Sequence, residues 1–279
     1  MESLAIIAEF NPFHTGHARL VRQVRQAAGP EVAIVIIMSG AFVQRGEPAF
    51  FDKWHRAAWA IDGGADVVIE LPAVYALSSA AGFAQGGVTL AARLGCQALA
   101  CGVEGGTAAD FLSLARRAEG LTACLKAAKK SSAGQQLTDA LMAAAPDEAR
   151  LLQQPNALLA FEYARAMLKQ EQPLTFLPLP RQGRHGDPGL GAAFASASAL
   201  RQAMRCSGTA AACRPYLTAA SLAGAENQLA QGTFTDYGRY GDFVASQNRL
   251  LTPDQLRSLP AFTEGLENRW HRAFMESGS

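Results

Sequence analysis

Two histidines near the N-terminus have the residue type and spacing needed for chemistry on phosphates. His14 and His17 belong to the string His-Thr-Gly-His, in which Gly16 lacks a side chain, so a phosphate could approach the backbone closely. Imidazole N–H groups can follow the negative charge that develops on a phosphate as pyrophosphate leaves. The string therefore predicts a nucleotide site. Ordinary polar residues of a loop are the alternative, because a bare His-x-Gly-His string is weak evidence.

The elements around this string strengthen the prediction. An apolar run over residues 4–8 is typical of a buried parallel strand. Asn11-Pro12 ends it, because proline disfavours helical backbone at the residue before it. An amphipathic helix is expected over residues 18–27. The histidines would thus lie where a strand ends and a helix begins, and the free N–H groups and the dipole of a helix N-terminus favour anions.

A second segment suited to phosphate binding lies at residues 195–201, Ala-Ser-Ala-Ser-Ala-Leu-Arg. Ser196 or Ser198 can cap a short helix, and Arg201 is expected within its first turn. Hydroxyls, helix N–H groups and a guanidinium would converge there, which suits a terminal phosphate. A plain helix cap explains this segment alone about equally well. When the segment is considered together with the histidine string, the plain helix cap becomes the poorer explanation.

Strand and helix patterns alternate over residues 1–101, which predicts an α/β fold with a doubly wound, parallel, Rossmann-like sheet and right-handed crossovers. Strands are expected at residues 4–8, 32–38, 67–72, 98–101 and 174–179. Ligands bind at the carboxyl edge of such sheets, so the loops after these strands should face the site. We expect a nucleotide-binding domain over residues 1–205 and a smaller, partial helical C-terminal region over residues 206–279.

Three other groups of polar residues have weaker assignments. Asp52 can cap a helix that runs to about residue 61. Lys53 and Arg56 lie one turn apart on this helix, and the favoured interpretation is that they form a solvated helix face. Asn156 is a plausible N-cap of a helix over residues 157–169, with a ligand contact as the alternative. Helices with a break near Ser131-Ser132 are expected over residues 108–145. The most basic local region there is Arg116, Arg117, Lys126, Lys129 and Lys130, for which a solvated face is favoured over an RNA patch.

Composition excludes several classes of protein. Hydrophobic residues make up 49% of the 279 residues, enough for a sizeable core. No apolar run approaches the roughly 20 residues that span a bilayer, and no secretory signal is visible. The five cysteines form no Cys-x-x-Cys pair and are interpreted as reduced thiols of a cytoplasmic protein. A net charge of +1 gives no global nucleic-acid signature, so RNA contacts would need a local patch.

Taken together, the motifs resemble those of one family, the bacterial tRNA(Met) cytidine acetate ligases, within the HIGH-motif nucleotidyltransferase superfamily. Two strings are specific to this family: residues 39–48, Ser-Gly-Ala-Phe-Val-Gln-Arg-Gly-Glu-Pro, and residues 264–269, Glu-Gly-Leu-Glu-Asn-Arg. The other matching strings are residues 8–17, 52–54, 68–72, 154–156 and 196–201. The resemblance spans nearly the whole chain.

The resemblance implies a two-step reaction. Acetate and ATP give acetyl-adenylate and pyrophosphate, and the acetyl group then passes to N4 of the wobble cytidine of elongator tRNA(Met). ATP is thus a substrate, Mg²⁺ is expected with it, and no metal-ligating residues are assigned. ATP contacts, including the two serines named above, are expected at Ile7, Ala8, Glu9, Phe10, Asn11, Pro12, Phe13, His14, Thr15, Gly16, His17, Ala18, Arg19, Leu20, Gly102, Asn156, Arg181, Ser196 and Ser198. The candidate catalytic residues are His14, His17, Lys53 and Arg201.

The chain departs from the family pattern in two ways. The family usually has a threonine where Ser198 stands, and the hydroxyl is kept. The family also continues with a helical region after the Glu-Gly-Leu-Glu-Asn-Arg string, whereas this sequence ends ten residues after Arg269. We therefore expect ATP binding and acetate activation, but weak and strongly salt-dependent tRNA binding.

Two other functions stay open from the sequence. A small-molecule adenylyltransferase of the pantetheine-phosphate or NMN type shares the His-x-Gly-His and Ser-x-Ser-x-x-Arg elements but not the loop at residues 44–48. A non-catalytic nucleotide- or RNA-binding module is the alternative from another class. The sequence indicates no oligomeric state.

Overall fold

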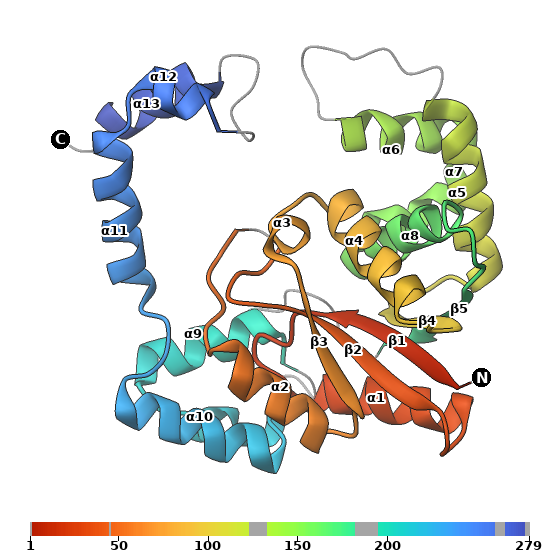
Figure 1. Cartoon of the computed structure of the whole chain (residues 1–279), viewed down its shortest axis with the longest axis horizontal. Coiled ribbons are helices and arrows are strands. Elements are labelled where there is room, and N and C mark those ends of the chain that lie inside the picture. The colour runs from red at the N-terminus through yellow and green to blue at the C-terminus, as the bar shows by residue number, and fades with distance from the viewer. Residues whose placement is uncertain (1, 45, 123–132, 182–194, 260–265, 277–279) are drawn as a thin grey trace. The chain divides into compact units, whose positions relative to one another are not determined.

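The fold centres on a five-stranded parallel sheet with the strand order β3-β2-β1-β4-β5 (Figure 1). The computed structural model describes residues 2–44, 46–122, 133–181, 195–259 and 266–276. The strands are β1 (Ser3–Ala8), β2 (Ala33–Ser39), β3 (Val67–Leu71), β4 (Ala98–Val103) and β5 (Thr175–Pro180). The expected α/β, doubly wound parallel sheet is therefore confirmed.

The central strands are buried on both faces, which explains their continuous apolar runs. Ile6 on β1 pairs in register with Ile36 on β2 and with Ala100 on β4. All three side chains are buried, as expected for a parallel sheet covered by helices on both sides. Strand β3 lies at one edge, and Val67 at its start is exposed. The strand order reverses between β1 and β4, and α/β sheets bind ligands at such a point.

Helices cover both faces of the sheet (Figure 1). Helices α1 (Thr15–Ala28) and α2 (Lys53–Asp62) cover one face; α4 (Ala80–Arg93), α5 (Ala108–Thr122) and α8 (Pro155–Met167) cover the other. The small residues of α4 allow the close packing that their sequence predicts. A Cβ atom on Gly87 would lie only 2.6 Å from Ile7 Cδ1 of β1. Helix α4 can therefore lie directly against the central strand.

Contacts divide the chain into two compact units, residues 1–234 and 235–279. The first also contains α3 (Ala73–Ala76), α6 (Ala133–Ala144), α7 (Pro146–Ala149), α9 (Ala197–Ser207), α10 (Ala219–Gln231) and the 3₁₀ helices η1 (Arg150–Gln153) and η2 (Ala211–Tyr216). The second contains α11 (Tyr237–Leu250), α12 (Pro253–Arg257) and α13 (Leu266–Glu276).

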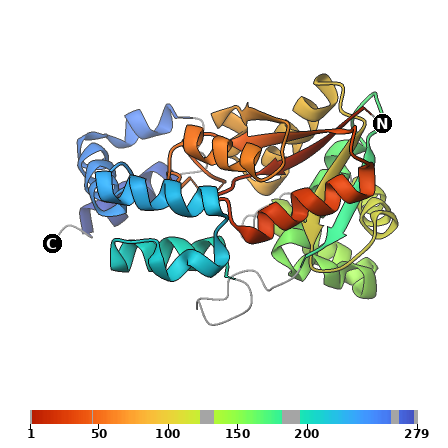
Figure 2. The ribbon, with the colours of Figure 1, turned by 90° about the horizontal axis from the view of Figure 1, so that it is seen from below.

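Helix α10 belongs to the first unit because it packs beside α2 (Figure 2). The Gln228 side chain lies 3.1 Å from His55 Nε2, and Gly224 sits against Trp59 with no room for a side chain. The compact unit thus continues past residue 205, the expected domain boundary. The functional division at that residue stays a prediction.

Two further expectations from the sequence concern a helix break and membrane-spanning segments. The break near Ser131-Ser132 lies outside the described residues. Among the residues that the structure describes, no helix combines the length and the apolar character needed to cross a membrane.

Candidate functional site

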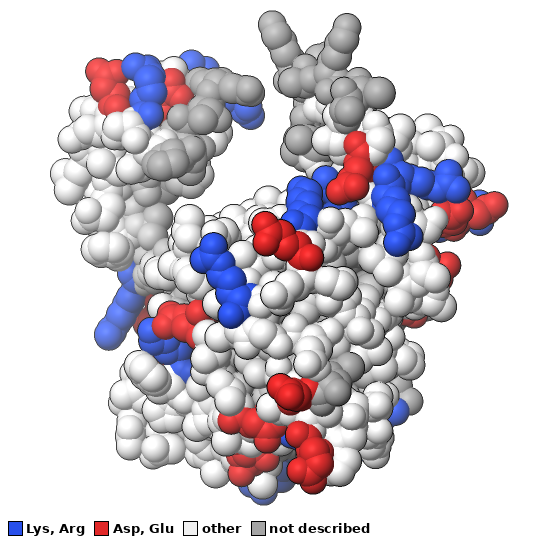
Figure 3. Space-filling view, turned by 45° about the vertical axis from the view of Figure 1, so that its right-hand side comes forward, with Lys and Arg blue, Asp and Glu red and all other residues white. Residues whose placement is uncertain are grey.

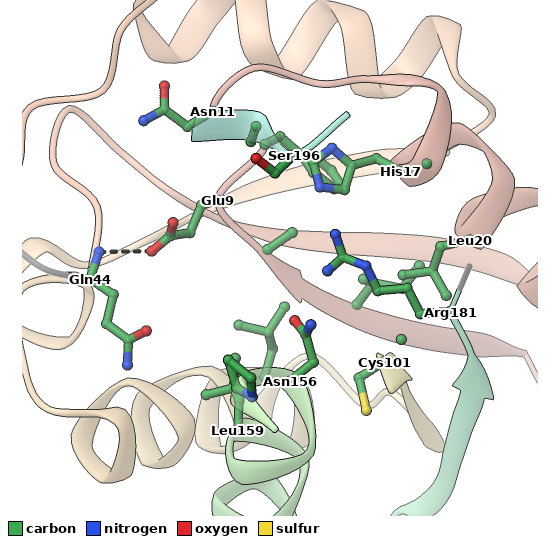
Figure 4. A pocket seen from close by; sticks show the side chains of 18 of the residues that line it. Glu9, Asn11, His17, Leu20, Gln44, Cys101, Asn156, Leu159, Arg181 and Ser196 are labelled. Carbon is green, nitrogen blue, oxygen red and sulfur yellow. Dashed lines mark hydrogen bonds between the residues drawn. The ribbon is translucent and has the colours of Figure 1, made fainter. Parts of the chain in front are cut away.

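A cavity of about 740 Å³ opens at the carboxyl ends of β1, β4 and β5, at the reversal of strand order. Most of the site residues predicted from the sequence meet there. The predicted residues that line it are Ile7, Ala8, Glu9, Phe10, Asn11, His14, Thr15, Gly16, His17, Arg19, Leu20, Gly102, Asn156, Arg181, Ser196, Ser198 and Arg201. Figure 4 shows the Arg181 guanidinium between the His17 ring and Asn156, with Ser196 beside His17.

His14 caps the helix that follows it. It is the N-cap of α1, and its Nδ1 accepts a hydrogen bond from Gly16 N at 3.0 Å. A Cβ atom on Gly16 would lie 2.7 Å from His14 Cε1, so the glycine makes room for this ring. Because Nδ1 accepts a hydrogen bond, the ring proton is assigned to Nε2. His14 Nε2 is buried and has no hydrogen-bond partner among the described residues, so it is an available N–H donor.

His17 completes a reciprocal cap and stacks on His14. His14 N donates to His17 Nδ1 at 3.3 Å, and the two rings lie 3.7 Å apart, centroid to centroid. Phe10 packs against the His17 ring, with the centroids at 4.8 Å. Phe10 has a positive φ of 48°, the left-handed backbone region that few residues with side chains adopt. The same tautomer argument assigns the His17 proton to Nε2.

Both imidazoles are neutral at physiological pH. Burial, followed by the positive charge of Arg181, lowers the pKa of His14 from 6.5 to about 3. Burial and the neighbouring His14 and Arg181 hold the pKa of His17 well below its usual range, although the Pro12 carbonyl acts in the opposite direction. The pair therefore offers uncharged N–H donors, which can donate hydrogen bonds to a phosphate oxygen.

This burial predicts acid sensitivity of the fold. His14 has a pKa near 6.5 when unfolded and about 3 when folded, so the unfolded chain binds more protons between these values. Its contribution to stability is complete above pH 6.5 and is lost progressively as the pH falls toward 3. Such a group adds up to about 1.4 kcal/mol per pH unit to the slope of stability against pH.

Urea unfolding at pH 7, 6, 5 and 4 measures that slope. We expect His14→Asn to have a flatter slope than the parent, because an asparagine can cap α1 without becoming charged. Comparison with the variant cancels the contributions of the carboxylates that the two proteins share. Equal slopes would contradict the assignment of His14 as a buried, neutral residue.

One carboxylate, that of Glu104, holds Asn156 and acts electrostatically on Arg181. Glu104 accepts hydrogen bonds from the Asn156 side chain and, at 3.1 Å, from Ala157 N at the start of α8. Burial lowers the pKa of Arg181, and Glu104 opposes this shift. The prediction that Asn156 caps the helix is wrong, because Gln154 is the N-cap and Asn156 lies within the first turn. Its side chain instead binds Glu104 and lines the cavity.

The second phosphate motif meets the first through Arg201. Ser196 is the N-cap of α9, and its Oγ accepts from Ala199 N at 3.1 Å and lies 2.9 Å from Ser198 Oγ. Arg201 is the fifth residue of α9, one position beyond the predicted first turn. Its Nη1 donates to Asn11 O at 2.7 Å, and its Nη2 lies 3.8 Å from Glu47 Oε2. The two segments thus line one cavity, as their chemistry predicts.

Arg56 positions the loops behind the cavity. The prediction of a solvated face is wrong for this residue, which is 0% exposed. Its guanidinium donates to Phe51 O at 3.0 Å, Glu9 O at 2.6 Å and Ser39 O at 3.1 Å, and also to Gly40 O. One side chain therefore joins the chain segments that leave β1 and β2. Glu9 also accepts from Gln44 N at 2.8 Å, which ties the second loop to the first (Figure 4).

Four predicted site residues do not line the cavity. Pro12, Phe13 and Ala18 are buried behind it, and Lys53 lies elsewhere, with its Nζ 2.5 Å from Glu70 Oε2. Their roles in ATP binding or catalysis stay predictions without support from this geometry. The sequence analysis missed several lining residues, among them Val43, Gln44, Glu47, Ser78, Ser79, Phe83, Leu159 and Tyr163. The string at residues 39–48 was a signal for the first three.

Comparison with known proteins identifies the family. The chain matches the HIGH Nucleotidyl Transferase family over residues 1–279. It is 36% identical over 285 residues to the tRNA(Met) cytidine acetate ligase of Latilactobacillus sakei, covering 100% of this chain and 70% of that protein. It is 31% identical over 307 residues to the tRNA(Met) cytidine acetate ligase of Lysinibacillus sphaericus, covering 100% and 72%.

Comparison with solved structures points to the same family. The apo crystal structure of Thermotoga maritima TmcAL (form I) superposes with a TM-score of 0.90 at 30% identity, covering 100% of this chain and 69% of the other. A second crystal form of that protein, bound with alpha-thio ATP, has a TM-score of 0.86 at 30% identity and covers 100% and 68%. This chain therefore belongs to the tRNA(Met) cytidine acetate ligases, a family of HIGH nucleotidyltransferases.

Proposed function

We propose that this protein activates acetate with ATP and transfers the acetyl group to N4 of the wobble cytidine of elongator tRNA(Met). The observation that carries the proposal is the stacked pair of neutral histidines in a cavity that Arg181 and Arg201 also line. Such uncharged donors beside two guanidinium groups suit the departure of pyrophosphate from a nucleotide. The names of the relatives support acetate and tRNA(Met) as the other substrates.

In the first step, a carboxylate oxygen of acetate attacks the α-phosphorus of ATP. The bond between the α-phosphorus and the oxygen that bridges to the β-phosphate breaks, and pyrophosphate leaves with the electron pair. The histidine Nε2–H groups and the start of α1 offer donors to the phosphate oxygens, where negative charge increases. Arg181 and Arg201, which line the cavity, bind the phosphates through their guanidinium groups.

Mg²⁺ is expected to enter as part of the substrate MgATP. The described residues contain no group of three or more His, Cys, Asp or Glu side chains that could hold a metal ion. Mg²⁺ commonly binds through substrate phosphates and one or two carboxylates and keeps several water molecules. Glu9 and Glu47 are two carboxylates that line the cavity and could contact those waters.

In the second step, the cytidine N4 attacks the carbonyl carbon of acetyl-adenylate. A C–N bond forms, the C–O bond to the phosphate breaks, N4 loses a proton and AMP leaves. On the face shown in Figure 3, Lys and Arg side chains lie singly or in small groups, with Asp and Glu among them. Arg117 of the predicted basic patch lies 3.6 Å from Glu148, and Lys126, Lys129 and Lys130 lie outside the described residues. The RNA patch therefore stays a prediction.

Isotope exchange between pyrophosphate and ATP tests the first step. We expect exchange that requires acetate and is not supported by NMN or phosphopantetheine. Transfer of labelled acetate to elongator tRNA(Met), with initiator tRNA as the control, tests the second step. Exchange driven by NMN or phosphopantetheine would identify a small-molecule adenylyltransferase. ATP binding without exchange would indicate a non-catalytic module.

We expect acetyl transfer without a covalent enzyme intermediate. Acetyl-adenylate is a mixed anhydride and is already activated, so no nucleophilic side chain is needed. Cys101 lines the cavity, but burial and then the Glu104 charge raise its pKa to about 12, which keeps the thiol protonated. Intact mass spectrometry after acid quenching, with ATP and acetate but no tRNA, should show only unmodified protein. An acetylated Cys or Ser peptide would contradict this.

A further inference from the structure

One end of the cavity is built from residues outside the two phosphate motifs, of which only Ile7 is also an expected ATP contact. This apolar end consists of Ile7 on β1, Cys101 on β4, Phe83 on α4 and Leu159 and Tyr163 on α8. All five line the cavity and belong to, or pack against, one continuous apolar cluster. Figure 1 shows α4 and α8 side by side above the sheet, and in Figure 4 Arg181 lies between His17 and the pair Leu159 and Cys101.

Tyr163 places a single polar group in this apolar end. The residue is 1% exposed, and its hydroxyl has no hydrogen-bond partner among the described residues. Buried tyrosine hydroxyls normally find a partner, so this one suggests that a ligand supplies it. Burial, followed by electrostatic interactions with Cys101 and with the Glu9 carboxylate, raises the pKa of Tyr163 well above its usual range. The hydroxyl therefore stays protonated and is a donor.

The surroundings of Tyr163 favour an anionic group with a short alkyl chain. The five side chains of the apolar end carry no charge, since the Cys101 thiol stays protonated, and the Glu9 carboxylate that acts on Tyr163 is not one of them. Ser79 and Ala80, at the N-terminus of the 14-residue helix α4, line the same cavity, and a helix N-terminus favours negative charge. An adenine ring would offer several polar edges to this apolar wall, whereas a carboxylate offers one acceptor next to a methyl group.

We propose that the apolar end binds the alkyl group of the carboxylic acid substrate and that the Tyr163 hydroxyl donates a hydrogen bond to its carboxylate. This inference rests on the proposed function, because the bound acid must face the α-phosphate of ATP. Phe83, Leu159 and Ile7 then limit the length of the acid to a short aliphatic chain. Tyr163 is a substrate-binding residue in this arrangement.

The substitution Tyr163→Phe tests the hydrogen bond. We expect the KM for acetate in pyrophosphate exchange to rise about tenfold or more, the usual effect of losing a hydrogen bond to a charged group. The Kd for ATP, measured without acid, should stay within about twofold. The variant should fold as well as the parent, because removing an unpartnered buried hydroxyl leaves no group unsatisfied. Tyr75→Phe on α3 makes the same change away from the cavity and should leave the KM unchanged.

The substitution Leu159→Ala tests the apolar wall. Each methylene in such a pocket changes specificity roughly 10–200-fold, so we expect kcat/KM for propionate or butyrate to rise at least tenfold relative to acetate. Leu168→Ala, at the other end of α8 and away from the cavity, is the matched control and should leave selectivity unchanged. Selectivity that stays the same in Leu159→Ala would overturn the assignment of the alkyl pocket.

The outcomes separate this inference from the proposed function. If the parent supports no acid-dependent exchange, the proposed function fails. If the parent activates acetate but Tyr163→Phe has an unchanged KM for acetate, the inference alone fails. A rise in the ATP Kd equal to the rise in the acetate KM would place the nucleotide at the apolar end and would also overturn the inference.

Discussion

Replacing His14 or His17 by alanine slows adenylate formation by roughly 10²–10³-fold, while the Kd for ATP changes much less. This size is typical for the loss of one preorganised donor to a developing negative charge. The structural reason is the tautomer that the reciprocal cap imposes: each Nδ1 accepts a backbone N–H, which assigns the ring proton to Nε2, and His14 Nε2 has no hydrogen-bond partner among the described residues. Pre-steady-state pyrophosphate release at saturating ATP and acetate measures the chemical step directly.

Two further variants separate the donor from the helix cap. His14→Asn keeps an acceptor for Gly16 N but lacks the Nε2–H donor. This variant should therefore fold normally but form the adenylate as slowly as His14→Ala. His17→Gln places an amide N–H near the former Nε2 and should recover part of the rate that His17→Asn loses. Unchanged turnover with a raised KM for ATP would show that the histidines serve binding instead.

Arg201→Lys should weaken ATP binding tenfold or more although the charge is kept. Nη1 of Arg201 donates to Asn11 O at 2.7 Å, and Nη2 lies near Glu47, so the guanidinium contacts two loops of the cavity at once. A lysine offers one compact charge and cannot make both contacts while also facing a phosphate. Isothermal titration with ATP in the absence of acetate measures the effect, which includes the loss of the Asn11 contact.

The matched control for this substitution is Arg205→Lys, one turn later on α9. Arg205 is exposed and does not line the cavity, so the same chemical change there should leave the Kd for ATP unaltered. Arg181→Lys should behave like Arg201→Lys, because both arginines line the cavity. ATP binding as tight in Arg201→Lys as in the parent would show that Arg201 holds the loop without binding the nucleotide.

The sequence predicts the sheet and the phosphate motifs well because both depend on local patterns. Buried parallel strands need continuous apolar runs, and an anion site at a helix N-terminus needs small or capping residues next to donors. Both requirements are visible within about ten residues, as at residues 4–17. The meeting of His14 and Arg201 in one cavity also follows from placing their loops at the same edge of the sheet.

Residues that depend on distant partners were missed or misassigned. Charged side chains are usually exposed and aromatic ones buried, but helix α2 shows the reverse, since Arg56 is 0% exposed and Trp54 is 74% exposed. No local pattern reveals that the Arg56 guanidinium satisfies carbonyl groups from three separate segments. Tyr163 was missed for a similar reason, because it lies in an apolar helix and only its unpartnered hydroxyl distinguishes it.

The contact between Arg201 and Asn11 also orders events during synthesis. It joins residues 190 positions apart in the sequence, so the phosphate end of the cavity cannot close until α9 has left the ribosome. Strand β1 pairs with β4, and β4 pairs with β5, only after the intervening helices have been made, which gives the fold many contacts between distant residues and favours slow folding. The two histidines are thus translated well before Arg201 and can act only after Arg201 has been made.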